Sequence, residues 1–330
     1  VTEPPERCIE THLKKGQRIG FDPWLFTVDQ ARRITDAATK AGGTAVPVDK
    51  NPLDAIWTDQ PEAPIAPVVP QDMRYAVRTA EEKRRAIGKV LSDEGTDAAV
   101  ITAPDSLAWL LNVRGGDVPR TPFALGFAVL HKDGHVDVFM DPRKFTPATL
   151  AHLGNEVTVQ PREGFANALD ALGQEKKRVS IDTNTAGVWI RDRLTKAGAT
   201  VKVGEDPCAL PKATKNPVEI EGTRAAHRRD GAAITRFLAW LAQEAPKGNL
   251  TEIQAAEKLA SFRRQDPLFR DFSFDTISGA GPNGAVVHYR VNEKTNRKIE
   301  TNSLYLVDSG GQYFDGTTDI TRTIAIGTPT

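Results

Sequence analysis

The chain has 330 residues, of which 39% are hydrophobic and 26% are charged. This composition is ordinary for a globular protein and excludes a wholly disordered or collagen-like chain. At about 150 residues per domain, the length predicts two domains or three small ones. Lysine plus arginine number 43, and aspartate plus glutamate also number 43, so the chain lacks the basic excess of a general nucleic-acid binder.

Two features bear on the compartment. No apolar run approaches the roughly 18 residues of a membrane-spanning helix, and residues 1–5 are neither basic nor followed by an apolar stretch, so we expect no membrane association and no signal peptide. Cys8 and Cys208 fit neither a disulfide framework nor a zinc site. Free thiols are typical of a reducing compartment, which predicts a cytoplasmic protein.

The first segment, residues 1–70, has an α/β pattern. Strands at 17–22 and 44–49 flank a helix at 28–41, an order that predicts a parallel pair, with Pro47 favouring an edge. The segment is thin for an independent core, so we interpret it as the C-terminal part of a larger domain. Prolines recur at every third residue from Pro61 to Pro70, which suits an extended linker and places a boundary at 61–71.

The second segment, residues 72–214, is also α/β. Helices are expected at 80–92, 106–113, 165–172 and 188–197, and strands at 97–103, 156–159, 178–182 and 201–203. Two apolar runs within 123–140 surround Lys132-Asp133-Gly134, which is a strong hairpin signal.

The third segment, residues 215–330, begins with helices. Pro217 starts a long one, and Thr251 with Gln254 forms the capping box of another. Strands are then expected at 272–277, 286–290, 304–313 and 320–326, linked by glycine-rich turns. The pairs Arg228-Arg229 and Arg263-Arg264 are interpreted as solvated helix faces.

A dense polar cluster runs from Asp308 to Thr323. Asp308 ends a strand that should be buried, where a carboxylate is costly unless it is paired or bound to metal. Asp315-Gly316 predicts a two-residue turn, which puts residue 312 opposite residue 319. Asp308 and Asp319 then share a face but lie four residues apart, roughly 13 Å, unless a bulge at Gly310-Gly311 or a wider turn brings them together.

The spacing alone therefore permits a pair of oxygen ligands for Mn²⁺, Mg²⁺ or a borderline metal without establishing one. Turn chemistry and an exposed threonine-rich strand explain the same residues, and Asp315 is interpreted as a turn residue. His288 ends an apolar segment after a turn at 281–284. It is a candidate acid, base or anion binder, and an ordinary exposed histidine is the alternative.

Three motifs resemble the Xaa-Pro aminopeptidases (aminopeptidase P) of the pita-bread metallopeptidase family. They are SGAGPNGAVVHY at 278–289, YLVDSGGQY at 305–313 and DGTTDITRT at 315–323. Upstream, NPLDAIWTDQP at 51–61, AWLLNVRGGD at 108–117 and FRRQ at 262–265 resemble the long, three-domain form of these enzymes. The resemblance covers essentially the whole chain.

The resemblance implies a fold that is α/β and α+β. Two α/β creatinase-N-like domains, 1–70 and 72–214, would precede the N-terminal half of a pita-bread catalytic domain at 215–330. It also implies a metal-dependent hydrolase that releases an N-terminal residue from peptides with proline in the second position. A water or hydroxide bridging two divalent metals, most often manganese, is the nucleophile in this family.

Three residues of this sequence match the motifs that carry the family's chemistry. Asp308 and Asp319, eleven residues apart, match its metal ligands, and His288 matches a histidine beside the substrate. The family draws its remaining ligands, one histidine and two glutamates, from the second half of the catalytic domain. We therefore expect a chain that is truncated at both ends and inactive by itself.

Alternative readings remain open. The chain could be a pita-bread homologue without peptidase activity, either a creatinase-like hydrolase or a peptide- or protein-binding module. It could also be a short association protein that retains the α/β domains. A prolidase shares the metal ligands, but the additional α/β domain favours the aminopeptidase. Expected partners are Xaa-Pro peptides and, from the resemblance, a second copy in a homodimer, with no nucleic acid and no membrane.

Overall fold

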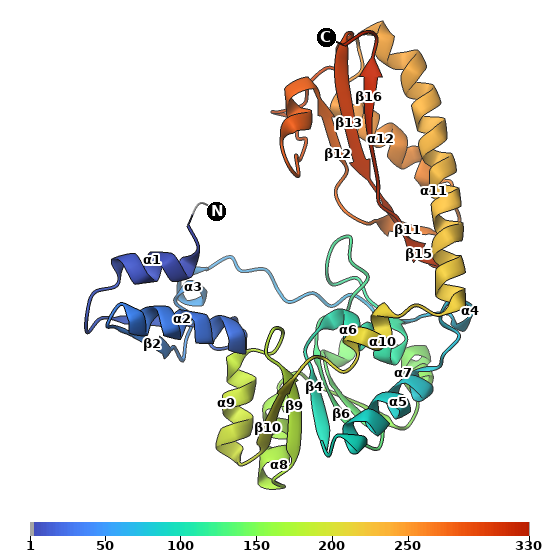
Figure 1. Cartoon of the computed structure of the whole chain (residues 1–330). Helices are drawn as coiled ribbons and strands as arrows, with labels where there is room; N and C mark the ends of the chain where they lie inside the picture. Colours follow the sequence, from blue (N-terminus) through green and yellow to red (C-terminus); the bar gives the residue numbers. More distant parts are fainter. Residues whose placement is uncertain (1–2, 330) are drawn as a thin grey trace. The chain divides into compact units, whose positions relative to one another are not determined.

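The computed structural model describes residues 3–329, which form two compact units (Figure 1). The first unit comprises the residues up to Gln71, then Arg78–Val118 and Pro122–Thr214. The second comprises Asp72–Val77, Pro119–Thr121 and the residues from Lys215 on. The division into three domains, with a boundary at 61–71, stays a prediction.

The N-terminal part of the first unit has the predicted parallel pair. Strand β1 (Arg18–Phe21) pairs in parallel with β2 (Thr44–Pro47), and α2 (Val28–Lys40) connects them. The Thr27 hydroxyl accepts from the Gln30 N–H, and the Gln30 side chain accepts from the Thr27 N–H, so a capping box fixes the start of α2. The short helices α1 (Pro5–His12) and α3 (Pro52–Ile56) flank the pair. Residues 60–67 form no helix or strand.

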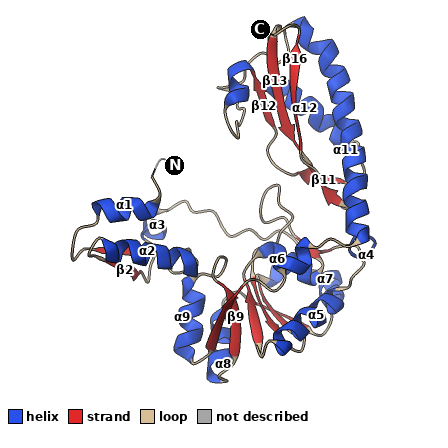
Figure 2. Cartoon of the chain, in the orientation of Figure 1, coloured by secondary structure: helices blue, strands red, loops and turns tan. Residues whose placement is uncertain are grey.

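A mixed six-stranded sheet forms the centre of the first unit (Figure 2). Its strand order is β10-β9-β4-β6-β7-β8, and the predicted hairpin is the antiparallel pair β6–β7. The strands are β4 (Ala98–Ile101), β6 (Phe127–His131), β7 (Val136–Phe139), β8 (Val157–Gln160), β9 (Arg178–Asp182) and β10 (Thr200–Gly204).

Helices cover both faces of this sheet because its strands are apolar on both sides. One core contains residues of α5 (Ala80–Asp93), α6 (Pro104–Leu111) and α7 (Pro147–Leu153), and the other contains residues of α8 (Gly164–Gln174) and α9 (Val188–Ala197). Val28 and Ala31 of α2 belong to the second core, so the N-terminal pair is packed into this unit. Smaller elements complete it, namely β3 (Val69–Pro70), β5 (Val113–Arg114), η1 (Pro142–Lys144) and α10 (Ala209–Ala213).

The second unit packs two helices against two small antiparallel sheets (Figure 1). Its long helix α11 (Pro217–Glu244) begins at an Asn216 capping box with Pro217 in the first turn, and α12 (Glu252–Arg263) begins at the predicted Thr251–Gln254 box. One sheet has the order β11-β14-β15 and the other β12-β13-β16. The strands are β11 (Phe269–Phe272), β12 (Ile277–Ala280), β13 (Ser303–Ser309), β14 (Gly311–Tyr313), β15 (Gly316–Thr317) and β16 (Ile320–Ile326); the remaining elements are α4 (Met73–Ala76), η2 (Ala245–Lys247) and η3 (Gly281–Ala285).

Two predicted strands of this unit are wrong. Residues 273–276, the middle of the expected strand 272–277, form no strand, because the chain there passes from one sheet to the other between β11 and β12. Residues 286–290 form a loop after the 3₁₀ turn η3, and His288 has a φ of 53°, which a strand does not tolerate. The strands expected at 304–313 and 320–326 are confirmed, with Gly310 dividing the first into β13 and β14.

Candidate metal centre

The turn before β16 determines where the two predicted metal ligands lie. Tyr313 pairs with Gly316 and Gln312 with Thr317, so the two-residue turn is Phe314-Asp315. The predicted turn, Asp315-Gly316, is therefore wrong by one position. The register is shifted by two residues, and residue 312 faces residue 317 instead of residue 319.

Packing against α11 explains the position of this turn. A Cβ on Gly222 would lie 2.5 Å from the carbonyl oxygen of Asp315, and one on Gly316 would lie 3.0 Å from the Cα of Thr223. The helix and the hairpin therefore approach each other through glycines. The Asp315 carboxylate forms an ion pair of 2.6 Å with the Arg229 guanidinium, which also pairs with Asp266 at 2.8 Å. Asp315 is thus a turn residue, as predicted, and it is also anchored to the helix.

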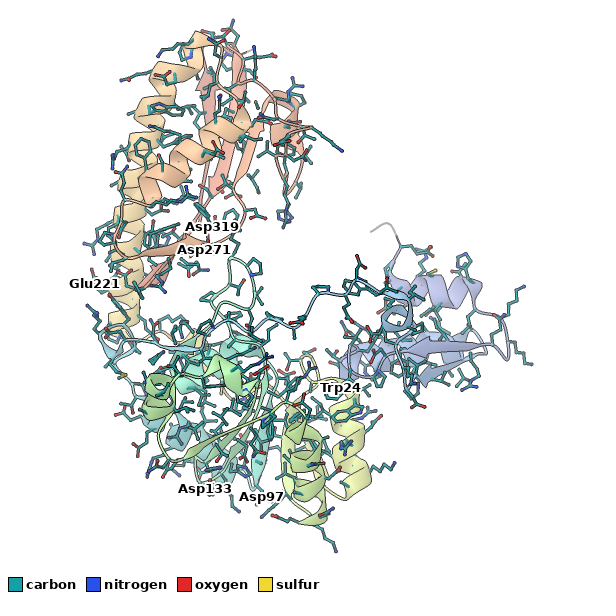
Figure 3. The ribbon with its side chains drawn as sticks, turned by 180° about the vertical axis from the view of Figure 1, so that it is seen from behind. Trp24, Asp97, Asp133, Glu221, Asp271 and Asp319 are labelled. Carbon is teal, nitrogen blue, oxygen red and sulfur yellow. The ribbon has the colours of Figure 1, made fainter. Side chains whose placement is uncertain are left out.

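The resulting register brings Asp308 and Asp319 together. Asp308 pairs with Thr321 across β13 and β16, so Asp319 is its diagonal neighbour on the same face. Gly310 permits the close approach at this point, because a Cβ there would collide with the carbonyl oxygen of Thr318 and the hydroxyl of Ser273. Figure 3 labels Asp319 in the second unit, near the junction of its two sheets.

The two carboxylates of this pair lie close together, and each disfavours the negative charge of the other. Partial burial, the Asp308 charge and a hydrogen bond with the Asp308 carboxyl group raise the pKa of Asp319, and the charge of His227 on α11 lowers it. The Oδ1 atom of Asp308 is buried and has no hydrogen-bond partner in the described residues. An unpaired acceptor beside a second carboxylate is an arrangement that a bound cation would satisfy.

Asp230, a third carboxylate, is linked to Asp319 through Thr318, and both of its oxygens accept hydrogen bonds. Asp230 of α11 and Arg263 of α12 are both 0% exposed, and two hydrogen bonds of 2.6 and 3.1 Å join them. The hydroxyls of Tyr313 and Thr318 also donate to Asp230, at 3.0 and 2.7 Å. Burial and the neighbouring Asp230 charge raise the pKa of Tyr313, so this phenol stays a donor. The network fixes Thr318, the residue directly before Asp319.

His288 lies on the loop after η3 and is exposed. The adjacent Tyr289 is only 8% exposed, and its hydroxyl donates to the carboxylate of Glu252 at 3.1 Å. Glu252 is the first residue of α12 and is 0% exposed. The structure therefore joins Asp308 to Asp319 and anchors the loop of His288 to α12.

Sequence reasoning missed Asp230, Arg263 and Glu252. The prediction that Arg263 lies on a solvated face is wrong, because its side chain is fully buried. A signal was present in the helical periodicity. Asp230 lies on the buried stripe of α11 between Ala226 and Ala233, while Glu252 and Arg263 lie on that of α12 with Ala255 and Leu259. A charged residue on an apolar stripe indicates a buried polar partner.

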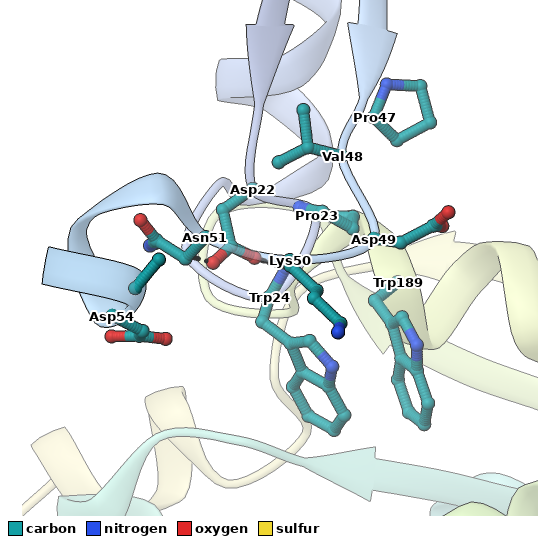
Figure 4. Close-up of a pocket in the computed structure, with 11 residues that line it drawn as sticks. Asp22, Pro23, Trp24, Pro47, Val48, Asp49, Lys50, Asn51, Asp54 and Trp189 are labelled. Atoms are coloured by element: carbon teal, nitrogen blue, oxygen red, sulfur yellow. Dashed lines mark hydrogen bonds between the residues drawn. The ribbon is translucent and has the colours of Figure 1, made fainter.

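A cavity of about 600 Å³ lies in the first unit (Figure 4). Trp24 and Trp189, which stack at 3.9 Å, line it together with Asp22 and Asn51, whose side chains are joined by a 2.9 Å hydrogen bond. None of the three predicted site residues contributes to this cavity, and the side chains around it are mostly exposed.

The carboxylate pair does not fill a metal coordination sphere. Within residues 3–329, no group of three or more histidine, cysteine, aspartate or glutamate side chains is arranged to hold a metal ion. Asp308 and Asp319 nevertheless fit a shared divalent cation in chemistry, since both present hard oxygen donors and one oxygen is orphaned. No helix in this part of the chain combines the length and apolar character needed to cross a bilayer.

Comparisons with known proteins show what this chain is similar to. Residues 59–219 match the creatinase/prolidase N-terminal domain, and residues 221–330 match metallopeptidase family M24. The probable Xaa-Pro aminopeptidase P of Aspergillus flavus is 37% identical over 324 residues, 96% of this chain and 49% of that protein. The corresponding Penicillium rubens protein is 39% identical over 326 residues, 96% of this chain and 52% of that protein. The chain thus spans about half the length of these relatives.

Solved structures also resemble this chain. An X-prolyl aminopeptidase from Caenorhabditis elegans, described as a cytosolic enzyme with a di-nuclear active site, superposes with a TM-score of 0.93 and 32% identity over 99% of this chain and 54% of that one. An Xaa-Pro dipeptidase from Bacillus anthracis has a TM-score of 0.57 and 22% identity over 76% of this chain and 66% of that one, so it shares the fold. Residues 59–219 are therefore similar to a creatinase/prolidase N-terminal domain, residues 221–330 are similar to metallopeptidase family M24, and the whole chain shares the fold of the worm enzyme.

Proposed function

We propose that the protein containing this chain is a metal-dependent Xaa-Pro aminopeptidase that acts in the cytosol. It would release the N-terminal residue from peptides whose second residue is proline. The observation that carries the proposal is the diagonal pair Asp308–Asp319, with its unpaired buried oxygen, in a segment similar to family M24. The similarity to the cytosolic, di-nuclear worm enzyme supports both the substrate class and the compartment.

Asp308 and Asp319 would hold the metal, for which we propose two divalent ions and most readily Mn²⁺. Bound there, the metal would lower the pKa of a water molecule and polarise the scissile carbonyl group. The two carboxylates contribute negative charge and a fixed spacing. The Asp230 network contributes rigidity, because it holds Thr318 on one side of Asp319.

We propose that His288 contacts the substrate. Its imidazole is exposed at the tip of a loop, where it could donate a hydrogen bond to the developing oxyanion or relay a proton to the leaving nitrogen. Positioned donors of this kind typically contribute about 10²- to 10⁴-fold to the rate. We also propose that the protein forms a homodimer.

The test is made on the native protein that contains these 330 residues. Wild type should cleave Xaa-Pro peptides, should cleave Xaa-Ala analogues poorly, and should contain Mn²⁺ or another divalent ion by elemental analysis. Asp308→Asn should lose both metal and turnover. His288→Ala should keep the metal and lose about 10²-fold or more in kcat/KM. His135→Ala, in the first unit, is the matched control and should behave as wild type.

The outcomes separate the alternatives. Cleavage without preference for proline would contradict the aminopeptidase assignment. A metal-bound protein that hydrolyses another small substrate would favour a creatinase-like hydrolase, and peptide binding without metal or turnover would favour a binding module. With only two ligands grouped in the described residues, we expect the 330-residue chain alone to bind Mn²⁺ weakly and to leave peptides intact.

A further inference from the structure

Glu252 is a buried carboxylate without a cationic partner. Its residue is 0% exposed, and no ion pair joins it to a lysine, arginine or histidine anywhere in residues 3–329. Removing a carboxylate from water destabilises the fold unless other groups replace the lost solvation. Here neutral hydrogen-bond donors replace the lost solvation. The position of these donors shows which segment of the chain Glu252 binds.

All of these donors belong to one segment, residues 280–297. The backbone N–H of Ala280 donates to Oε1 at 2.7 Å, and the Asn283 amide donates to the same oxygen at 3.0 Å. The backbone N–H of Arg297 donates to Oε2 at 2.9 Å, and the Tyr289 hydroxyl donates to it at 3.1 Å. One carboxylate therefore gathers the start, the middle and the end of this segment at a single point.

The backbone around Glu252 ties down the same segment. The N–H of Glu252 donates to the carbonyl oxygen of Arg297 at 3.0 Å, and the N–H of Ile253 donates to the Asn296 side chain at 3.1 Å. Between η3 and β13 the segment has no helix or strand of its own. Its conformation therefore depends on these contacts with the first turn of α12 and on hydrogen bonds within the segment, in which the carbonyl oxygen of Thr295 accepts from the Asn283 amide and the Tyr289 hydroxyl at 3.2 and 3.1 Å.

The unanchored part of the segment is the tip that bears His288. Val286 and Val287 are 54% and 83% exposed, and His288 adopts a φ of 53°, a conformation that is unfavourable for a non-glycine residue. Tyr289, the next residue, is drawn into the protein by its bond to Glu252. Glu252 thus acts one residue away from the imidazole and keeps it turned outward.

A carboxylate suits this task better than an amide does. An ionised carboxylate only accepts hydrogen bonds and offers about four lone-pair directions, whereas a glutamine presents two N–H donors on one of its two terminal atoms. In Glu252→Gln, one set of bonds, either to Ala280 and Asn283 or to Tyr289 and Arg297, must face a donor. The variant keeps the volume of the side chain but places a donor opposite hydrogen-bond donors of the segment.

We propose that Glu252 is a positioning residue for the segment 280–297 and that it acts through His288. The inference rests on the proposed function, in which His288 contacts the peptide. It predicts that the loop, and with it substrate recognition, is more sensitive to Glu252 than the sheet of the same unit is.

The test compares Glu252→Gln with Glu257→Gln in the native protein. Glu257 is on the same helix and is exposed, so its variant makes the same chemical change without touching the loop. In hydrogen–deuterium exchange, Glu252→Gln should lose protection in peptides covering 280–297 and keep it in β13 and β16. On an Xaa-Pro peptide, kcat/KM should fall about 10- to 100-fold, since displacing a reacting group by about 1 Å can cost 10²-fold. Glu257→Gln should match wild type in both measurements.

A double-variant cycle distinguishes positioning from general stabilisation. If Glu252 acts through His288, then Glu252→Gln should cost little more in a His288→Ala background. Additive losses, an unchanged kcat/KM, or equal loss of protection in β13 and β16 would overturn the inference while the peptidase assignment stands. A wild-type protein that does not cleave Xaa-Pro peptides would overturn the proposed function and this role together.

Discussion

Two carboxylate sites in the second unit contrast in how completely they are paired. Asp230 is 0% exposed and binds Arg263, Tyr313 and Thr318. Asp308 is only partly buried, yet one of its oxygens has no partner within the described residues, and the like-charged Asp319 lies beside it. The two sites are linked through Thr318, which donates to Asp230 and directly precedes Asp319.

The contrast shows how a carboxylate that stabilises the fold can be told from one that is available to bind a ligand. A buried carboxylate whose acceptors are all used is part of the framework, because it can take no ligand without losing a bond. A carboxylate that is left with an orphaned oxygen and a like-charged neighbour costs stability in the free protein. That cost is expected where a cation binds. The predictions that follow test this difference.

The largest effect is expected at the paired site. Asp230→Ala leaves the Arg263 guanidinium buried at 0% exposure without its partner, which should lower the free energy of unfolding by about 3–5 kcal/mol. Urea denaturation of the 330-residue chain measures this. Glu221→Ala removes an exposed partner of Arg228 on the same helix and should cost less than about 1 kcal/mol. Equal losses in the two variants would mean that the buried network is not the framework of this unit.

An intermediate effect is expected at the link between the sites. Thr318→Val removes a hydroxyl that donates to Asp230 and accepts from the Gly311 N–H at 2.9 Å, which should cost about 1–3 kcal/mol. It should also weaken Mn²⁺ binding, measured by electron paramagnetic resonance titration, because Asp319 loses its support. Thr318→Ser keeps the hydroxyl and should restore the Mn²⁺ affinity. Weak binding in the serine variant as well would show that packing, and not the hydrogen bond, controls Asp319.

The smallest effect, with the opposite sign, is expected at the unpaired site. Asp308→Asn removes the repulsion from Asp319 and should raise the thermal stability of the metal-free chain slightly. Wild type should gain about 1.4 kcal/mol when free Mn²⁺ is tenfold above its Kd, and the variant should gain nothing. Asp315→Asn, which affects only the ion pair with Arg229, should keep the response to Mn²⁺. A destabilised Asp308→Asn would contradict the idea that this carboxylate is strained without a ligand.

Local signals predicted most of the fold. The capping boxes at Thr27 and Thr251, Pro217 in a first helical turn and the Lys132-Asp133-Gly134 hairpin all act over a few residues, and each element they predicted is present. The two wrong strands lie at 273–276, where the chain passes from one sheet to the other, and at 286–290, in the loop after η3. The alternating residues at 272–277 and the apolar run at 285–287 both resemble a strand, but the conformation is set by contacts with residues far away in the sequence.

The sequence by itself predicted most of the elements, the resemblance to a family and the three candidate site residues, because propensity, capping and motif spacing depend on neighbouring positions. Only the tertiary structure decided that Asp308 and Asp319 are diagonal neighbours. The turn could close at Phe314-Asp315 or one residue later, and the packing of Gly222 and Thr223 against the hairpin selects the first register. A shift of two residues along a strand moves a side chain by about 7 Å, which is the difference between two separate carboxylates and one binding site.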